Sequence, residues 1–92
     1  MRPSLSIRCL ADLGAAFRRE RKVLKLTQAE VARRGGMRRE TVIKLESGGN
    51  VDALTLLKAV SALGKALRIA EVERLEYEEL QKFFDADDDE SP

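Results

Sequence analysis

Apolar residues recur every three or four positions through most of residues 10–64, which is the spacing of amphipathic helices. The first such segment runs from Leu10 to Leu24. Its apolar residues fall largely on one helical face and its basic residues crowd the others; the apolar set is Leu10, Leu13, Ala16, Phe17 and Leu24. We therefore expect a first helix that packs through this face, with Asp12 in the first turn, where a negative charge is favourable.

A second, short helix is expected at Gln28 to Arg34, because Thr27 and Glu30 have the spacing of a capping box. The Thr27 hydroxyl can accept from the Glu30 amide, while the Glu30 carboxylate can accept from the Thr27 amide. Gly35 and Gly36 end this helix by supplying a residue that is free to adopt a positive φ.

Two further helices are expected, at about Arg39 to Glu46 and Ala53 to Leu63. The third helix turns Val42 and Leu45 inward, and the expected buried stripe of the fourth is Leu54, Leu57, Val60 and Leu63. A short helix, a glycine turn and a short helix have the spacing of a helix-turn-helix, although a plain helical hairpin in a small bundle has it too. The predicted fold class is all-α, a bundle of four to five helices.

The pattern changes after Gly64. Residues 66–72 alternate Leu67 and Ile69 with Arg68 and Ala70, a weak period-2 signal for a short strand. The same region is rich in good helix formers, so a continuing helix is the alternative. Residues 73–84 have approximate helical spacing of apolar residues, and residues 85–92, DADDDESP, have the composition of a disordered tail.

Composition excludes most catalytic and metal chemistry. The chain has no histidine and a single cysteine, Cys9, so it can form neither an intramolecular disulfide nor a thiolate metal cluster. It also lacks phosphate-loop and dinucleotide-binding motifs. We expect no enzyme, no cofactor and no metal, with Cys9 as a small buried hydrophobe near a helix start. With no apolar run of about 18 residues and no signal-peptide pattern, we expect a cytoplasmic protein without a membrane partner.

The two parts of the chain differ in charge. Residues 1–50 carry twelve Lys or Arg against five Asp or Glu, giving +7, while residues 51–92 carry five against eleven, giving −6. A basic segment attracts polyanions and an acidic segment is repelled by them. Nucleic acid would therefore contact the first part, and a different partner would contact the second.

Three linked motifs, TQAEVA at 27–32, GMRRETV at 36–42 and LESG at 45–48, resemble the Cro/C1-type (XRE) helix-turn-helix family. This family includes the lambdoid phage repressors and many bacterial antitoxins. The resemblance covers about residues 13–64 and implies a lambda-repressor-like bundle. With the changes in composition it divides the chain into an N-terminal arm at 1–9, a DNA-binding domain at 10–64, a dimerisation or partner extension at 65–84 and an acidic tail at 85–92.

The resemblance also implies contacts with double-stranded DNA. Arg39, Glu40 and Lys44 match positions that address base edges; Arg can fork onto guanine, Glu can accept from cytosine and Lys can reach guanine or a phosphate. We expect a half-site with G·C pairs. For each of these residues, a solvated charged face is the alternative.

The expected phosphate contacts lie around the same two helices. Gln28 matches a glutamine that donates its amide to a backbone phosphate, which fixes the position of the domain without reading sequence. The other expected contacts are Thr27, Arg38, Thr41 and Asn50. Arg38 replaces the small hydroxyl cap that is common in the family, so we expect a weaker N-cap on the third helix.

Arg21 and Glu46 match a family pair that joins the first helix to the end of the third. The resemblance implies a partly buried salt bridge, and bidentate geometry suits a guanidinium and a carboxylate. Its role would be architectural.

The part after residue 64 is similar to HipB-type antitoxins. That resemblance implies that the strand at 66–72 pairs with the same strand of a second copy, through Leu67, Ile69 and Val72, and so spaces two recognition helices over an inverted repeat. The acidic C-terminal region would bind a toxin such as a HipA-like kinase; the alternatives are that Phe83 and Phe84 fold back on the homodimer, or that the charge only aids solubility. The predicted function is a homodimeric repressor that is also the antitoxin of its operon; the alternative is an interaction module that neutralises a partner protein without specific DNA binding.

Overall fold

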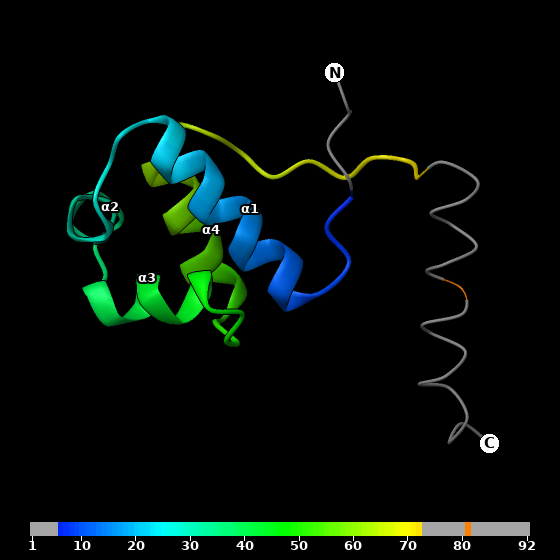
Figure 1. Ribbon diagram of the computed structural model, residues 1–92, viewed down its shortest axis with the longest axis horizontal. Coiled ribbons are helices and arrows are strands. Elements are labelled where there is room, and N and C mark those ends of the chain that lie inside the picture. The colour runs from blue at the N-terminus through cyan, green and yellow to red at the C-terminus, as the bar shows by residue number, and fades with distance from the viewer. Residues whose placement is uncertain (1–5, 73–80, 82–92) are drawn as a thin grey trace. The chain divides into compact units, whose positions relative to one another are not determined.

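The computed structural model describes residues 6–72 and residue 81, and four helices account for the regular structure of residues 6–72. They are α1 (Leu10–Val23), α2 (Gln28–Gly35), α3 (Arg39–Glu46) and α4 (Ala53–Ala62), shown in Figure 1. All four lie within one compact unit, Ile7–Arg68. The predicted all-α bundle is confirmed.

The helix ends follow the local sequence signals. The capping box of α2 is present, with the Glu30 amide donating to the Thr27 Oγ1 at 3.0 Å and the Thr27 amide donating to Glu30 Oε1 at 2.9 Å. Gly36 ends α2 with a φ of +68°. Arg38, at the start of α3, gives no side-chain cap, as expected from its loss of the hydroxyl.

The core lies where α3 packs against α1 and α2, and where α2 packs against α4. Three of its side chains, Val31, Val42 and Leu45, are essentially inaccessible to solvent. The complete set of buried apolar residues is Phe17, Val31, Ala32, Val42, Leu45, Ala59, Val60 and Leu63. The inward orientation expected for the third helix is therefore found.

The expected buried stripe of the fourth helix is wrong in half of its members. Leu54 is 62% exposed and Leu57 is 51% exposed, whereas Val60 and Leu63 are buried and the small Ala59 is fully buried. Leucines occupy two adjacent faces of this helix, so periodicity alone did not identify the inner one. The face with Ala59 turns inward because a small side chain lets two helices approach closely.

The first helix also departs from its expected face at both ends. Leu10 and Leu24 are exposed, because Leu10 is the first helical residue and Leu24 follows the last one. Cys9 precedes the helix and is exposed as well, so its predicted burial is wrong. Phe17, a member of the expected face, is buried in the middle of α1, and Arg21, which is not part of that apolar face, is buried nearer its end.

Residues 65–72 form neither helix nor strand. The alternative of a helix continuing through residues 66–72 is thus not found. The strand stays a prediction, since its backbone partners would belong to a second copy. Of the expected helix at 73–84 only residue 81 is described, and the expected tail at 85–92 lies outside the described residues. None of the described helices has the length and apolar character that a membrane crossing requires.

Candidate nucleic-acid interface

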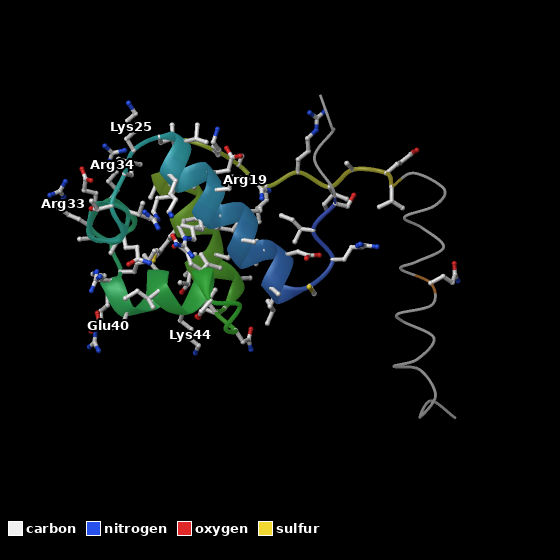
Figure 2. All side chains as sticks on the ribbon, in the orientation of Figure 1. Arg19, Lys25, Arg33, Arg34, Glu40 and Lys44 are labelled. Atoms are coloured by element: carbon white, nitrogen blue, oxygen red, sulfur yellow. The ribbon has the colours of Figure 1, made fainter. Side chains whose placement is uncertain are left out.

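The helix α3 has one buried face and one charged face. Val42 and Leu45 are buried in the core, while Arg39, Glu40 and Lys44 are exposed. Figure 2 shows Glu40 and Lys44 pointing away from the other three helices. The three residues expected to read bases therefore lie on the exposed side of α3, and the opposite side of the helix fixes it to the bundle.

The end of α3 is fixed to α1 by a bidentate ion pair between Arg21 and Glu46. Arg21 Nε donates to Glu46 Oε2 at 2.6 Å, and Arg21 Nη2 donates to Glu46 Oε1 at 2.9 Å. Arg21 is only 8% exposed. Its hydrogen bond to Glu46 raises the pKa of Arg21 above its ordinary value, against the opposing effect of desolvation. The structure thus places these two residues in the geometry that the family resemblance implied.

The same guanidinium also stabilises the turn between α1 and α2. Arg21 Nη1 donates to the backbone oxygen of Leu26 at 2.9 Å. The preceding residue, Lys25, has a φ of +59°, in the left-handed region that non-glycine residues rarely adopt. One buried side chain therefore holds α1, the turn and the end of α3 together. Because residue 25 is a lysine and not a glycine, the sequence did not indicate a left-handed residue in the turn.

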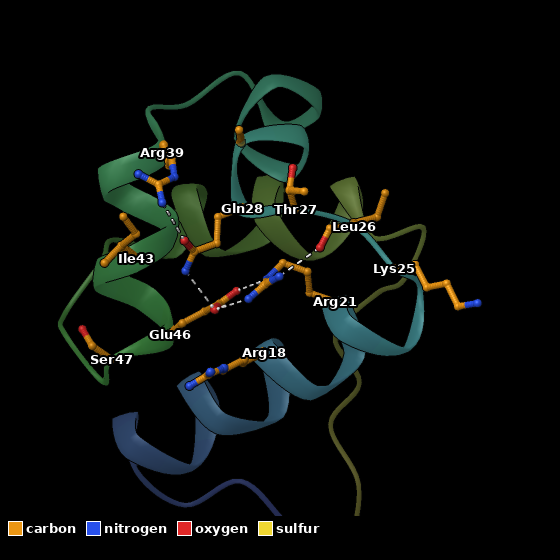
Figure 3. Close-up of a pocket in the computed structure, with 11 residues that line it drawn as sticks. Arg18, Arg21, Lys25, Leu26, Thr27, Gln28, Arg39, Ile43, Glu46 and Ser47 are labelled. Carbon is orange, nitrogen blue, oxygen red and sulfur yellow. Dashed lines mark hydrogen bonds and ion pairs between the residues drawn. The ribbon is translucent and has the colours of Figure 1, made fainter.

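A second set of polar contacts joins this ion pair to the start of α3. Gln28 Nε2 donates to Glu46 Oε1 at 3.2 Å, and Arg39 Nη2 donates to Gln28 Oε1 at 3.5 Å (Figure 3). The last contact is long and therefore weak. Gln28 uses one of its two amide hydrogens on Glu46, which leaves the other for a phosphate. The sequence did not reveal this link, because no local pattern signals a contact between residues that lie 18 or 11 positions apart along the chain.

These residues line a groove between α1, α2 and α3, with a volume of about 590 Å³. Its charged and amide lining residues are Arg18, Arg21, Lys25, Gln28, Arg39 and Glu46, and Leu26, Ala29 and Ile43 are among the apolar ones. Figure 3 shows Arg39 and Arg18 near opposite ends, with Gln28 and Glu46 between them. Arg18 was not among the residues expected to contact DNA, because on a helix with several basic residues the sequence does not show which one faces the groove.

The remaining expected phosphate contacts surround α3. Thr27 is exposed, but its hydroxyl accepts the cap hydrogen bond from Glu30. Arg38 is exposed and Thr41 is half-buried at the start of α3, while Asn50 is exposed beyond its end. The structure therefore brings Gln28 and Arg39 together and leaves Asn50 near the other end of α3.

Two carboxylates, Glu30 and Asp52, accept hydrogen bonds from backbone amides at the N-termini of α2 and α4. The hydrogen bond from the Thr27 backbone amide lowers the pKa of Glu30, and the one from the Thr55 amide lowers the pKa of Asp52. Asp52 caps α4 through a 2.7 Å bond to Thr55, a cap that sequence reasoning did not assign. Both carboxylates remain negatively charged near helix starts, where the dipole favours them.

A model of a helix-turn-helix family matches residues 17–69, more than half of the chain. The chain belongs to the XRE-type helix-turn-helix family. In this helix-turn-helix protein, α2 and α3 are the two helices of the motif, and α3 occupies the position of the recognition helix. The resemblance expected from the three sequence motifs is confirmed, and the protein is a DNA-binding helix-turn-helix regulator.

Six chains of solved structures also match. One, described as "HipB(S29A)-O2 20mer complex", has a TM-score of 0.70 and 22% sequence identity, covering 77% of this chain and all of that chain. At this identity the match shows that the two chains share a fold. The comparison with curated proteins gives no match.

Proposed function

We propose that this helix-turn-helix regulator is a sequence-specific transcriptional repressor that binds an inverted repeat as a homodimer. The observation that carries the proposal is the two-sided character of α3. Its apolar side is fully buried through Val42 and Leu45, and its outer side presents Arg39, Glu40 and Lys44. These side chains supply both donors and an acceptor for base edges in a major groove.

The charge distribution supports the same function. Residues 1–50 carry a net +7, and the described basic residues of this part include exposed side chains on α1, α2 and α3. Cations that neutralise phosphates release counterions from DNA, so the affinity should fall steeply with salt. The acidic residues are concentrated after residue 70, away in sequence from the helix-turn-helix.

Dimerisation through residues 66–72 follows from the sequence resemblance, and the exposure of apolar side chains in this segment supports it. Leu67 and Ile69 are exposed apolar side chains in the segment after α4, and Ile69 is fully accessible in the single chain. Pairing two such segments would cover these side chains and satisfy their backbone groups. Two copies would then present their recognition helices to successive major grooves, about one helical turn apart.

A further part of the proposal is that the protein is the antitoxin and autorepressor of a toxin–antitoxin operon. Two observations support it: the resemblance of the segment after residue 64 to HipB-type antitoxins, and the fold shared with the HipB complex. The acidic C-terminal region would bind the toxin, expected to be a HipA-like kinase. Co-expression of the chain with a kinase encoded beside it should restore growth, whereas a chain truncated after residue 72 should not. Equal protection by both would contradict toxin binding by the acidic region.

The decisive experiment for DNA recognition is selection from a random-sequence duplex pool, followed by titration at two salt concentrations. The wild-type protein should enrich an inverted repeat with G·C pairs in each half-site. Arg39→Ala should weaken binding to the selected site by about 1 to 3 kcal/mol and relax the preference at one base position. Arg34→Ala is the matched control, because Arg34 is exposed beside α4, in a different groove from Arg39.

Two outcomes would overturn this function. If no sequence is enriched and binding depends little on salt, the protein is an interaction module that retains the helix-turn-helix for its architecture. If Arg39→Ala and Arg34→Ala have the same effect on the selected site, α3 does not read bases through Arg39.

A further inference from the structure

The groove between α1, α2 and α3 contains more positive charge than its internal contacts use. Among the described residues that line it, the one carboxylate is Glu46, which is neutralised by the bidentate pair with Arg21. Three other cations line the groove: Arg18, Lys25 and Arg39. Because the buried pair cancels, the groove has a net charge of about +3 and attracts anions.

Arg18 lines this groove with its positive charge unpaired within the described structure. Among the described residues, its side chain has no hydrogen bond or ion pair, whereas Arg39 contacts Gln28. In Figure 3 Lys25 points away from Glu46, whereas Arg18 and Glu46 line the same two hollows of the surface. Arg18 is also one helical turn before Arg21 on α1, so the two side chains emerge on the same side of that helix.

We propose that Arg18 is a phosphate contact, and that this groove binds the sugar–phosphate backbone of the DNA strand beside the recognition helix. The proposal rests on the proposed function and adds to it a contact from α1, outside the helix-turn-helix itself. A backbone lying along the groove would meet the Arg18 guanidinium at one end and the second amide hydrogen of Gln28 further along. Guanidinium groups bind phosphate oxygens through paired hydrogen bonds.

The geometry gives this contact a positioning role. Arg18 and Arg21 share α1, and Arg21 is bonded to Glu46 at the end of α3. A phosphate held by Arg18 is therefore fixed relative to α3, and with it the depth and angle at which Arg39 enters the major groove. Contacts of this kind set the register of a protein on DNA without reading sequence.

Arg19 is the matched control on the same helix. It is exposed like Arg18 and carries the same charge, but it does not line this groove. It lines a neighbouring, largely apolar hollow with Ala11, Ala15 and Val23, a hollow that Arg18, Glu46 and Ser47 border as well. Arg18→Gln and Arg19→Gln thus remove equal charge from adjacent positions.

The test measures binding of both variants to a random-sequence duplex by fluorescence anisotropy over a series of salt concentrations. Arg18→Gln should reduce the slope of log affinity against log salt concentration by about one unit and weaken binding to all sequences alike. Arg18→Lys should recover most of the slope, and Arg19→Gln should stay close to wild type. Because Arg18 is exposed, thermal unfolding of the variant should match wild type, which separates a lost contact from a lost fold.

If Arg18→Gln and Arg19→Gln have equal slopes, the proposal is overturned, because only general charge matters. Failure of the Arg18 contact and failure of the proposed repressor function give different results. A wild-type protein that enriches no sequence, but whose salt slope still falls in Arg18→Gln, is a non-specific DNA-binding protein with this phosphate contact. A protein that enriches an inverted repeat, and keeps its salt slope in Arg18→Gln, is a repressor without it.

Discussion

Gly14 in α1 faces the backbone oxygen of Leu45 in α3, and a Cβ on Gly14 would lie 2.5 Å from that oxygen. It would also lie 2.7 Å from the backbone oxygen of Glu46. The two helices therefore approach closely at a residue without a side chain. This approach brings the end of α3 near enough to α1 for Arg21 to donate to Glu46 through two of its nitrogens, Nε and Nη2.

We predict that Gly14→Ala destabilises the domain. In an exposed helix interior the change would stabilise by about 1 kcal/mol, because alanine is the better helix former. Here the added methyl group meets backbone atoms that cannot move without separating α1 from α3, and overpacking of this kind costs about 1 to 3 kcal/mol. Denaturant unfolding gives the free energy of unfolding for comparison with wild type.

Gly35→Ala is the control for that measurement. A Cβ on Gly35 would lie 2.7 Å from Met37 Cε, the far end of a flexible side chain that can shift. This variant should be close to wild type in stability. A stabilised Gly14→Ala protein would show that α1 and α3 are not in close contact at this residue.

Loss of either partner of the Arg21–Glu46 pair should also destabilise the domain. Arg21 is buried, and its removal leaves Glu46 as an uncompensated carboxylate in the groove. Truncating one member of a buried pair costs about 3 to 5 kcal/mol. Arg21→Ala, Glu46→Ala and the double variant form a thermodynamic cycle on the free energy of unfolding. The double variant should be much more stable than the sum of the single effects implies, and simple additivity would contradict a direct interaction.

The stability of the domain should fall in acid through its two carboxylate caps. The pKa values of Glu30 and Asp52 are lowered in the folded protein by hydrogen bonds from backbone amides. A lowered pKa means that the folded state binds the proton less readily than the unfolded state. The stabilisation is therefore complete above the unfolded pKa values, about 4, and is lost as the pH falls through the lower folded values.

The measurement is thermal unfolding between pH 6 and pH 2. The double variant Glu30→Gln, Asp52→Asn should start with a lower Tm at pH 6 and lose less of it in acid than wild type. Parallel curves for the two proteins would contradict a role for these caps in acid sensitivity.

The proposed dimer predicts different effects for two exposed apolar residues. Ile69→Asp should disrupt pairing of residues 66–72 and give a monomer in sedimentation velocity, because it places like charges opposite each other in the two copies. Leu54→Asp, on the exposed face of α4, should leave the dimer intact. A monomeric Leu54→Asp protein with a dimeric Ile69→Asp protein would place the interface on α4 instead.

Much of the local structure could be predicted from the sequence. Thr27 and Glu30 fixed the start of α2, and Gly36 fixed its end, because caps and positive-φ positions depend on residues adjacent in the chain. The pattern around Val42 and Leu45 identified the inner side of α3. The Arg21–Glu46 geometry was implied by the family resemblance rather than by spacing.

Other features depended on the tertiary structure. The inner side of α4 was decided by close packing at Ala59 rather than by leucine periodicity, which fits Leu54 and Leu57 equally well. The left-handed Lys25 has no sequence signal, since it is stabilised by a guanidinium from another part of the chain through Leu26.

The sequence by itself therefore determined the four helices, the capping box of α2, the helix-turn-helix and the charge difference between the two parts of the chain, all of which arise from near neighbours or from composition. Only the tertiary structure decided which of the basic residues face a common groove. Arg18 and Arg19 carry the same charge and are adjacent in sequence, yet of the two only Arg18 lines the groove between α1, α2 and α3. The reason is that the groove is formed by three helices, and its lining depends on the rotation of each about its own axis.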